Sequence, residues 1–435
     1  MSLSKKPYKG CRDFFPSDMR VRNYLFEMMH KTAKSFNYLN YDGPTLEEVE
    51  LYKAKSGEEL INDQIYSFMD RGERFVAIRP EMTPTLARMV ANIHKQEQKP
   101  IRWYSIPNLM RYEKPQRGRL REHWQYNVDI FGAPKNLGEY EVLSLIKKLM
   151  DNFGASTDMY SILINDRSIV DFVFNELLSL SEQESYKLYK VIDKAKKVTA
   201  EKLDVMIGEI ITDENKKATF KQYLALKSFD DVEKFLESNN ASEVSFTDFI
   251  KLIKGNELET CLQYDPTIVR GLDYYTGLVF EVFDQHPDNR RAIAGGGAYA
   301  NLLQIFNENP LPGIGFGMGD VTLRDFLETH KLMPSFSEAE SDIFLCYFDD
   351  SSFAYANKIA TLMRENDLRV ELNLGPMKFN KMFKIAESKG HTNVGIIGED
   401  EVKNQTITLK NMKTRNQHNT AWDNSSEMIK FLKDS

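Results

Sequence analysis

Apolar residues follow a helical spacing in some segments of the chain and a strand spacing in others. After Pro16, apolar side chains recur every three or four residues, at Val21, Leu25, Met28, Met29 and Phe36. This spacing predicts a long helix with Ser17 as a candidate cap. The apolar run 75–78 predicts a buried strand, and Pro84 favours the start of a helix at Thr83.

Two strand-like segments, 103–110 and 123–131, are joined by a basic connection. In the second segment, the alternate residues Gln125, Asn127 and Asp129 share one face, and aromatic and aliphatic residues share the other. The apolar face is predicted to feed a core, and the polar face either lines a polar floor or meets solvent. The connection 111–121 carries four arginines and one lysine, which suits either phosphate binding by guanidinium groups or a solvated loop.

The middle of the chain has a different character. Residues 137–262 are mostly helical in pattern and highly charged, which predicts an inserted helical subdomain. Beyond it, 278–283 is predicted to be a strand. The glycines at 313, 315, 317 and 319 then place a face without side chains on one predicted strand. A planar ring can lie on such a face, or a helix can pack closely against it. A helix is predicted for 321–329.

A Pro/Ser/Glu-rich linker around 334–341 marks a domain boundary. Beyond it, strands are predicted at 343–348, 369–372, 394–397 and 406–409, with helices at 353–365, 378–388 and 428–432. This alternation predicts a small α/β domain with a largely buried sheet. Its basic residues are candidates for an RNA-facing surface or are simply solvated: Lys378, Lys381, Lys384, Lys410, Lys413 and Arg415.

Composition narrows the choice of class. A chain of 435 residues exceeds one ordinary core, so two or three domains are expected. No apolar run approaches the roughly 20 residues that span a bilayer, so no membrane association is expected. The three cysteines lie far apart, which fits a reducing cytoplasm and gives no metal-ligand spacing. The net charge of −7 argues against non-specific coating of nucleic acid, although a local basic patch remains compatible with it.

The most distinctive segment is 269–281. Arg270, Tyr274 and Tyr275 lie in a glycine-bounded turn that leads directly into a strand. Glycines let the backbone approach a ligand closely, and Arg and Tyr supply donors for carboxylate, phosphate or imidazole groups. The alternative is a β-turn whose tyrosines are buried in a core. Similarly, Glu81 and Thr83 at a strand-to-helix junction either begin the helix or hold an ammonium group.

Taken together, these segments resemble the class II aminoacyl-tRNA synthetases, and most specifically the histidyl-tRNA synthetases. The helix and strand up to Pro44 resemble motif 1, residues 110–132 resemble motif 2, and 313–327 resemble motif 3. The histidine-specific signature is closely matched by Arg270-Gly271-Leu272-Asp273-Tyr274-Tyr275-Thr276-Gly277. The implied fold is α/β (α+β): an antiparallel-sheet catalytic domain (1–333) with a helical insertion (about 165–262), and an α/β anticodon-binding domain (341–435).

The resemblance implies activation of L-histidine with ATP and Mg²⁺, followed by transfer to tRNA(His), in a cytoplasmic homodimer. Asp129 and Tyr275 are implied to bind the imidazole nitrogens, and Arg111 and Arg270 to act at the α-phosphate as catalytic residues. The residues implied to bind histidine are Glu81, Met82, Thr83, Arg111, Gln125, Asp129, Arg270, Tyr274 and Tyr275. Those implied to bind ATP are Arg111, Glu113 and Arg119.

The chain also departs from the family's pattern. Thr322 stands where motif 3 carries an arginine for the outer phosphate of ATP, and Ala298 and Ala300 replace an arginine and an aspartate around Tyr299. A non-catalytic, histidine-binding paralogue that regulates a partner is therefore the alternative to the ligase. The retained Arg111, Glu113, Arg119 and Arg270, together with the C-terminal domain, favour the enzyme.

Overall fold

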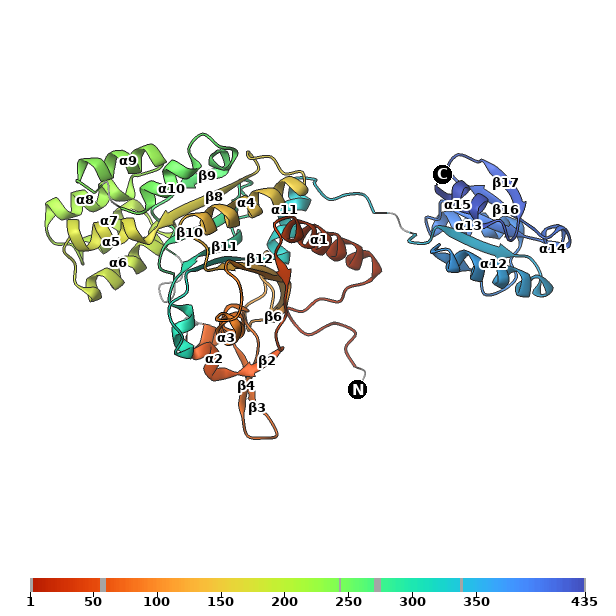
Figure 1. The fold of residues 1–435 in the computed structure, drawn as a ribbon, viewed down its shortest axis with the longest axis horizontal. Coiled ribbons are helices and arrows are strands. Elements are labelled where there is room, and N and C mark those ends of the chain that lie inside the picture. Colours follow the sequence, from red (N-terminus) through yellow and green to blue (C-terminus); the bar gives the residue numbers. More distant parts are fainter. Residues whose placement is uncertain (1–2, 55–59, 242–243, 270–274, 337–338, 434–435) are drawn as a thin grey trace. The chain divides into compact units, whose positions relative to one another are not determined.

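The protein is described by a computed structural model that covers residues 3–54, 60–241, 244–269, 275–336 and 339–433. It divides into two compact units, Met1–Met333 and Pro334–Ser435. Figure 1 shows both units as ribbons coloured along the sequence. They are called the N-terminal unit and the C-terminal unit.

The N-terminal unit is built on one large sheet, and the predicted antiparallel-sheet architecture is confirmed. The strands follow the order β1-β5-β7-β12-β11-β10-β8-β9, with β6 paired to β7. All neighbours from β5 to β8 in this order are antiparallel. Their bounds are β1 (Leu39–Asn40), β5 (Ile101–Ser105), β6 (Asn108–Met110), β7 (Glu122–Phe131), β8 (Tyr160–Asp166), β9 (Leu262–Tyr264), β10 (Leu278–Asp284), β11 (Ala292–Tyr299) and β12 (Gly313–Gly319).

The predicted single strand 103–110 is wrong, because it is divided into β5 and β6 around Pro107. Proline has no N–H for a sheet ladder, so the strand breaks there. The carbonyl of Pro107 still accepts a hydrogen bond from the Gln125 backbone at 3.2 Å. The break therefore leaves both short strands beside β7.

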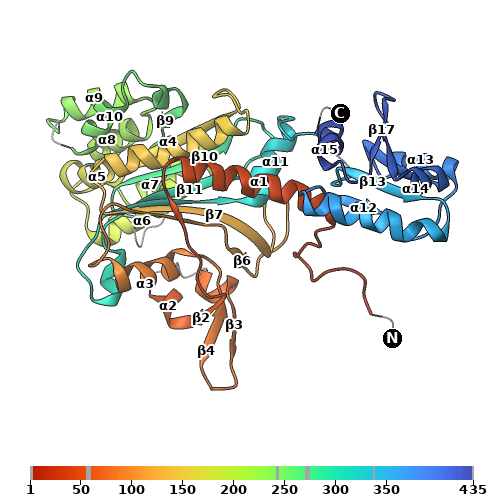
Figure 2. The same cartoon turned by 45° about the vertical axis from the view of Figure 1, so that its right-hand side comes forward.

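One face of the sheet is covered by the helices α1 (Pro16–Ser35), α4 (Leu137–Asn152) and α11 (Asp320–Thr329) (Figures 1 and 2). The apolar face of β7 contributes Tyr126, Val128 and Ile130 to this core, as the alternation predicts. Helix α1 begins at Pro16, two residues earlier than it would if Ser17 were its N-cap. Phe15 holds the N-cap position, and its N–H donates to the Asp18 carboxylate at 3.3 Å.

The opposite face carries smaller elements. These are α2 (Val49–Lys53), α3 (Thr83–Ile93), the 3₁₀ turn η5 (Leu302–Phe306), the π-helical turn η1 (Leu60–Gln64), and the three-stranded sheet of β2 (Leu46–Glu48), β4 (Phe75–Ile78) and β3 (Tyr66–Met69). Figure 2 shows α2, α3 and this small sheet on the side of the large sheet away from α1. A second core forms here, in which Met82 and Leu86 pack with Phe131 and Tyr299.

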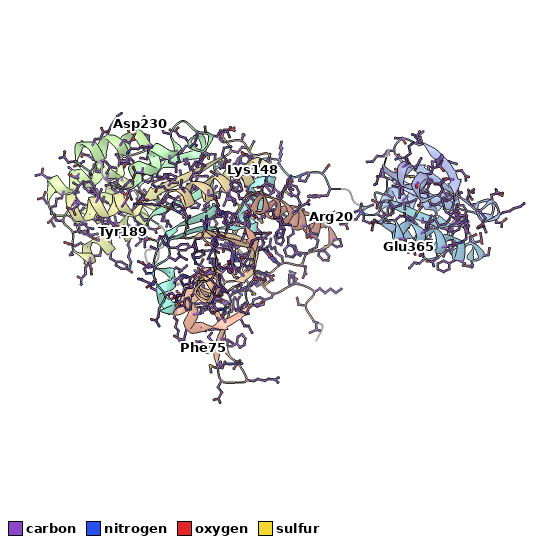
Figure 3. The ribbon with its side chains drawn as sticks, viewed as in Figure 1. Arg20, Phe75, Lys148, Tyr189, Asp230 and Glu365 are labelled. Atoms are coloured by element: carbon purple, nitrogen blue, oxygen red, sulfur yellow. The ribbon has the colours of Figure 1, made fainter. Side chains whose placement is uncertain are left out.

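The helical insertion leaves the large sheet at β8 and returns to it at β9, which pairs parallel to β8. It contains α5 (Arg167–Asp171), η2 (Phe172–Leu177), α6 (Glu182–Lys194), η3 (Ala195–Lys197), α7 (Ala200–Gly208), α8 (Glu214–Leu224), α9 (Phe229–Ser238), α10 (Phe246–Ile253) and η4 (Glu257–Cys261). Buried aromatic rings such as Phe174 and Tyr223 join it to the main core. Tyr189 of α6 and Asp230 of α9 are labelled in Figure 3.

The C-terminal unit has a five-stranded sheet in the order β14-β13-β15-β16-β17. Its elements are β13 (Ile343–Tyr347), η6 (Asp350–Ser352), α12 (Phe353–Glu365), β14 (Val370–Leu372), α13 (Phe379–Ser388), β15 (Asn393–Ile397), α14 (Glu399–Asn404), β16 (Thr406–Asn411), β17 (Gln417–Ala421) and α15 (Ser425–Lys433). Separate apolar clusters pack on the two sides of the fully buried β13, which confirms the predicted buried sheet. Helix α14 and strand β17 are missing from the prediction because their sequences are almost wholly polar.

Candidate active site

A cleft of about 270 Å³ lies where β7, β11 and β12 meet the connection 111–121 and the start of α3. It brings together most of the side chains predicted for the site: Glu81, Thr83, Arg111, Glu113, Arg119, Gln125, Asp129 and Tyr275. Met82 is placed elsewhere, because it is fully buried in the core beside α3. Arg270 and Tyr274 lie outside the described residues.

The polar face of β7 forms part of the cleft wall. Gln125, Asn127 and Asp129 line it, whereas the alternate residues of the strand enter the core. Of the two predicted uses of this face, the structure therefore shows the polar floor and excludes simple exposure to solvent. A ligand that lies here meets amide and carboxylate oxygens on a rigid strand in the middle of the sheet.

The glycines of β12 make room for these side chains. Gly315 pairs with Asp129 across the ladder, and a Cβ at Gly315 would overlap the Asp129 carboxylate. A Cβ at Gly317 would lie 2.6 Å from Cδ of Gln125. Side chains from β7 therefore occupy the face of β12 that lacks side chains. Gly315 and Gly317 make room for Asp129 and Gln125, and not for a closely packed helix, which was one of the two predicted uses of this face. Both glycines also line the cleft.

Asp129 is the most deeply buried acid of the cleft, with 6% of its surface exposed. The hydroxyl of Tyr299 donates a hydrogen bond to its Oδ1 at 2.6 Å. Burial raises the pKa of Asp129 to about 7, although the Tyr299 hydrogen bond favours the carboxylate. Burial also raises the pKa of Tyr299, so this residue stays a neutral donor. Tyr299 was not among the predicted site residues.

At the junction of β4 and α3, Arg111 Nε donates to the Pro80 carbonyl at 2.8 Å. This bond ties the guanidinium to the residue directly before Glu81, and no other hydrogen bond or ion pair joins the Arg111 side chain to a described residue. Further along the connection, Arg119 forms an ion pair with the buried carboxylate of Glu113. The two residues predicted to contact different parts of ATP are therefore neighbours.

Residues 10–321 match the family model described as histidyl-tRNA synthetase, and residues 342–432 match the anticodon binding domain. The chain belongs to the histidyl-tRNA synthetase family. It is 42% identical over 431 residues to a protein named histidine–tRNA ligase from Leptospira biflexa, covering 98% of each chain. A similar protein from Thermoplasma volcanium is 33% identical over 412 residues, covering 94% of each.

Solved structures share the fold of this histidyl-tRNA synthetase family member. The crystal structure of histidyl-tRNA synthetase from Nostoc sp. PCC 7120 superposes with a TM-score of 0.81 at 21% identity, covering 99% of this chain and 100% of that one. A structure from Bacillus halodurans, described as an ATP phosphoribosyltransferase regulatory subunit/histidyl-tRNA synthetase, has a TM-score of 0.72 at 21% identity. It covers 88% of this chain and 97% of that one. At these identities the likeness shows the fold alone.

The altered run around Tyr299 has a structural role in this member of the histidyl-tRNA synthetase family. The Ala298 carbonyl accepts a hydrogen bond from the Thr276 backbone at 2.8 Å. The Ala300 N–H donates to the Thr276 hydroxyl at 2.9 Å. Gly297 packs against Tyr275, since a Cβ there would lie 2.8 Å from Cδ1 of the ring. The run therefore holds the end of the signature segment through backbone atoms that any residue type supplies.

His123 was also missed by the prediction from sequence. It lines the cleft on β7, and burial, together with the charges of Arg111, Arg12 and Arg119, lowers its pKa to about 3. The ring is consequently neutral at physiological pH. His123 is two residues before Gln125, so the alternation that groups Gln125, Asn127 and Asp129 on one face could also have identified it.

Proposed function

We propose that the chain is a histidine–tRNA ligase, which forms histidyl-adenylate from L-histidine and ATP and then transfers histidine to the terminal ribose of tRNA(His). The observation that carries the proposal is the cleft itself, in which Asp129, Gln125, Glu81 and Arg111 converge on one volume. The 42% identity to a protein of that name over nearly the whole chain supports it.

The polar wall of the cleft suits the amino acid. An imidazole ring offers one N–H donor and one ring acceptor, which Asp129 and a tyrosine hydroxyl such as that of Tyr275 complement. The α-ammonium group is a cation with three donors, and Glu81, Thr83 and Gln125 supply acceptors for it. We assign the closing of this pocket to Tyr274 on the basis of the family resemblance.

The basic wall suits ATP. The histidine carboxylate attacks the α-phosphorus, a new P–O bond forms, and the bond to the pyrophosphate oxygen breaks. Negative charge builds up on the α-phosphate oxygens, and the proposed roles of Arg111 and Arg270 are to stabilise that charge. No proton transfer is needed. Glu113 and Arg119 are assigned to the adenine and outer-phosphate ends, respectively.

Magnesium is proposed to arrive as a complex with ATP. Mg²⁺ retains several waters and is commonly bound through substrate phosphates together with one or two carboxylates. Within the described ranges, no group of three or more His, Cys, Asp or Glu side chains is arranged to hold a metal ion. Glu113 is a carboxylate of the same cleft, and it is paired with Arg119, the residue assigned to the outer phosphates.

We propose that residues 1–333 are the catalytic domain, with an insertion at about 165–262, and that 341–435 bind the anticodon. The family match at 342–432 supports the second assignment. In this unit, Lys381 and Lys384 lie on α13 and Lys410 lies on β16, where phosphate contacts are expected. A homodimer is proposed on the resemblance of α1 and β1 to motif 1. A cytoplasmic location is proposed because the three widely spaced cysteines fit a reducing compartment. No described helix has both the length and the apolar character of a membrane span.

Histidine-dependent exchange of labelled pyrophosphate into ATP tests the ligase, with histidinol and other amino acids as controls. Exchange that requires histidine, followed by charging of tRNA(His), is the expected result. The alternative function is a histidine-binding regulatory paralogue, which the substitutions at Thr322, Ala298 and Ala300 favour. Histidine binding by calorimetry without any exchange would contradict the ligase and support the regulator.

A further inference from the structure

The cleft continues into a small basic recess whose wall contains Arg291. The recess, about 130 Å³, shares Gly118, Ile293 and Thr322 with the main cleft. Gly118 has φ of +70°, and a Cβ placed on it would lie 3.0 Å from Cδ of Arg291 and 3.3 Å from Cγ2 of Thr322. Arg291 and Thr322 therefore flank the same turn of the basic connection.

Thr322 carries a neutral hydroxyl and supplies no positive charge here. Its hydroxyl donates toward the carbonyls of Ile293 and Gly319, each at 3.3 Å, so the side chain is turned to the backbone. Arg324, the next cationic residue on α11, pairs instead with Glu328 at 2.7 Å. Neither residue of this helix places an uncommitted positive charge at the recess.

Arg291 differs from Arg117 and Arg119 in its partners. Arg119 pairs with Glu113, and Arg117 donates to the Asn289 side chain at 2.8 Å. Arg291 directly precedes β11, is partly buried, and has no ion pair with any described residue.

Nearby negative charges do not fully balance the positive charge of Arg291. Burial is the main factor that lowers its pKa, followed by the nearby charge of Arg119, and Glu113 opposes them only in part. Asp325 also lines the recess, but the cations that act on it are Arg117, Arg324 and Arg12. Two guanidinium groups, Arg119 and Arg291, therefore share one carboxylate in a partly desolvated wall. Such an arrangement favours binding of a polyanion.

We propose that Arg291 binds the outer phosphates of ATP. From its position directly before β11, it supplies the cation that Thr322 does not supply from α11. This inference rests on the proposed ligase function, which identifies ATP as the polyanion. A guanidinium group suits this position because its fork donates two parallel hydrogen bonds to phosphate oxygens. Arg291 acts by binding and orienting the pyrophosphate leaving group.

The test compares the wild-type protein with Arg291→Ala, Arg291→Lys and the control Arg324→Ala. Calorimetry measures binding of magnesium pyrophosphate, AMP and histidine, and pyrophosphate exchange gives the KM for ATP. For Arg291→Ala, pyrophosphate affinity is expected to fall and the KM for ATP to rise about tenfold or more, while AMP and histidine affinities stay within about twofold. Arg291→Lys is expected to lie in between, and Arg324→Ala to match the wild type.

A second-site variant strengthens the comparison. The double variant Arg291→Ala with Thr322→Arg is expected to recover most of the lost pyrophosphate affinity, because the new side chain starts beside Gly118. Wild-type affinity for pyrophosphate in Arg291→Ala would overturn the inference, as would an equal loss of AMP and histidine binding, which would indicate general damage. If the wild type itself fails to exchange, the ligase proposal fails, whereas the calorimetric comparison still decides the role of Arg291.

Discussion

Tyr299 on β11 donates a hydrogen bond to Asp129 on β7 at 2.6 Å, across the intervening strand β12. Gly315 makes this contact possible, because it is the β12 residue that pairs with Asp129 and carries no side chain to block it. Three strands thereby build one buried acceptor. We propose that this acceptor binds the imidazole of histidine, and its chemistry can be tested separately from the ATP end of the cleft.

Replacing Tyr299 with phenylalanine removes a hydrogen bond to a buried carboxylate and keeps the ring volume. We expect the KM for histidine to rise about tenfold, because a hydrogen bond to a charged group contributes roughly 1.5–3 kcal/mol. The KM for ATP should stay near that of the wild type. Pyrophosphate exchange at varied histidine and ATP measures both. A matching rise in the KM for ATP would contradict the separation of the two ends.

Asp129→Asn removes the titratable group of the same acceptor, and its effect on stability at different pH values tests the titration of Asp129. The folded-state pKa, about 7, lies above the ordinary value of 3.8, so folding binds a proton between these values. The associated stability is complete below about pH 4 and is lost as the pH rises through about 7. Asparagine does not titrate, so Asp129→Asn does not lose this stability as the pH rises. The variant should therefore be more stable than the wild type at pH 8, by an amount on the order of 2 kcal/mol. The affinity for histidine should nevertheless fall. A buried carboxylate that lowers the stability of the fold is expected to be present because it binds the substrate.

Urea unfolding at pH 5, 6.5 and 8 measures the difference in unfolding free energy between the wild type and Asp129→Asn. The gap in unfolding free energy between variant and wild type should widen with pH and then level off above about pH 8. A gap that is independent of pH would show that Asp129 titrates at its ordinary value in the folded protein.

Part of this site follows from local sequence pattern and part does not. The alternation in 123–131 predicts that Gln125, Asn127 and Asp129 share a face, because side chains alternate along any strand. That Tyr299 meets Asp129 is set by the strand order of the sheet, and the two residues are 170 positions apart. Likewise, Arg291 has no periodic or motif signal. It becomes notable only through its neighbours, Thr322 and Gly118.

Gly315→Ala tests whether the bare face of β12 is needed for the acid. The added methyl group would overlap the Asp129 carboxylate, and the acid and strands must then move. We expect a destabilisation of roughly 1–3 kcal/mol, as is usual for overpacking, and a loss of histidine binding that is larger than the loss of ATP binding. Gly319→Ala is the matched folding control, since its methyl group would lie no closer than 3.4 Å to Thr322 Oγ1. A normal melting temperature for Gly315→Ala would indicate that the carboxylate lies elsewhere.

His123 places a neutral ring in the basic wall of the cleft. Because its folded-state pKa is about 3, well below the ordinary 6.5, the unfolded chain takes up a proton first as the pH falls. His123 therefore contributes stability above about pH 6.5 that is lost progressively toward about pH 3. Phenylalanine keeps a planar ring and cannot titrate.

We expect His123→Phe to resist acid better than the wild type, with an advantage on the order of 1–2 kcal/mol at pH 5 that is absent at pH 8. The KM for ATP should change little, because a ring that is already neutral acts by shape rather than by charge. His123→Ala should raise that KM, since it removes the ring. If His123→Phe instead abolished exchange while the protein remained folded, a ring nitrogen of His123 would have to bind a substrate, and its role as a neutral surface would be wrong.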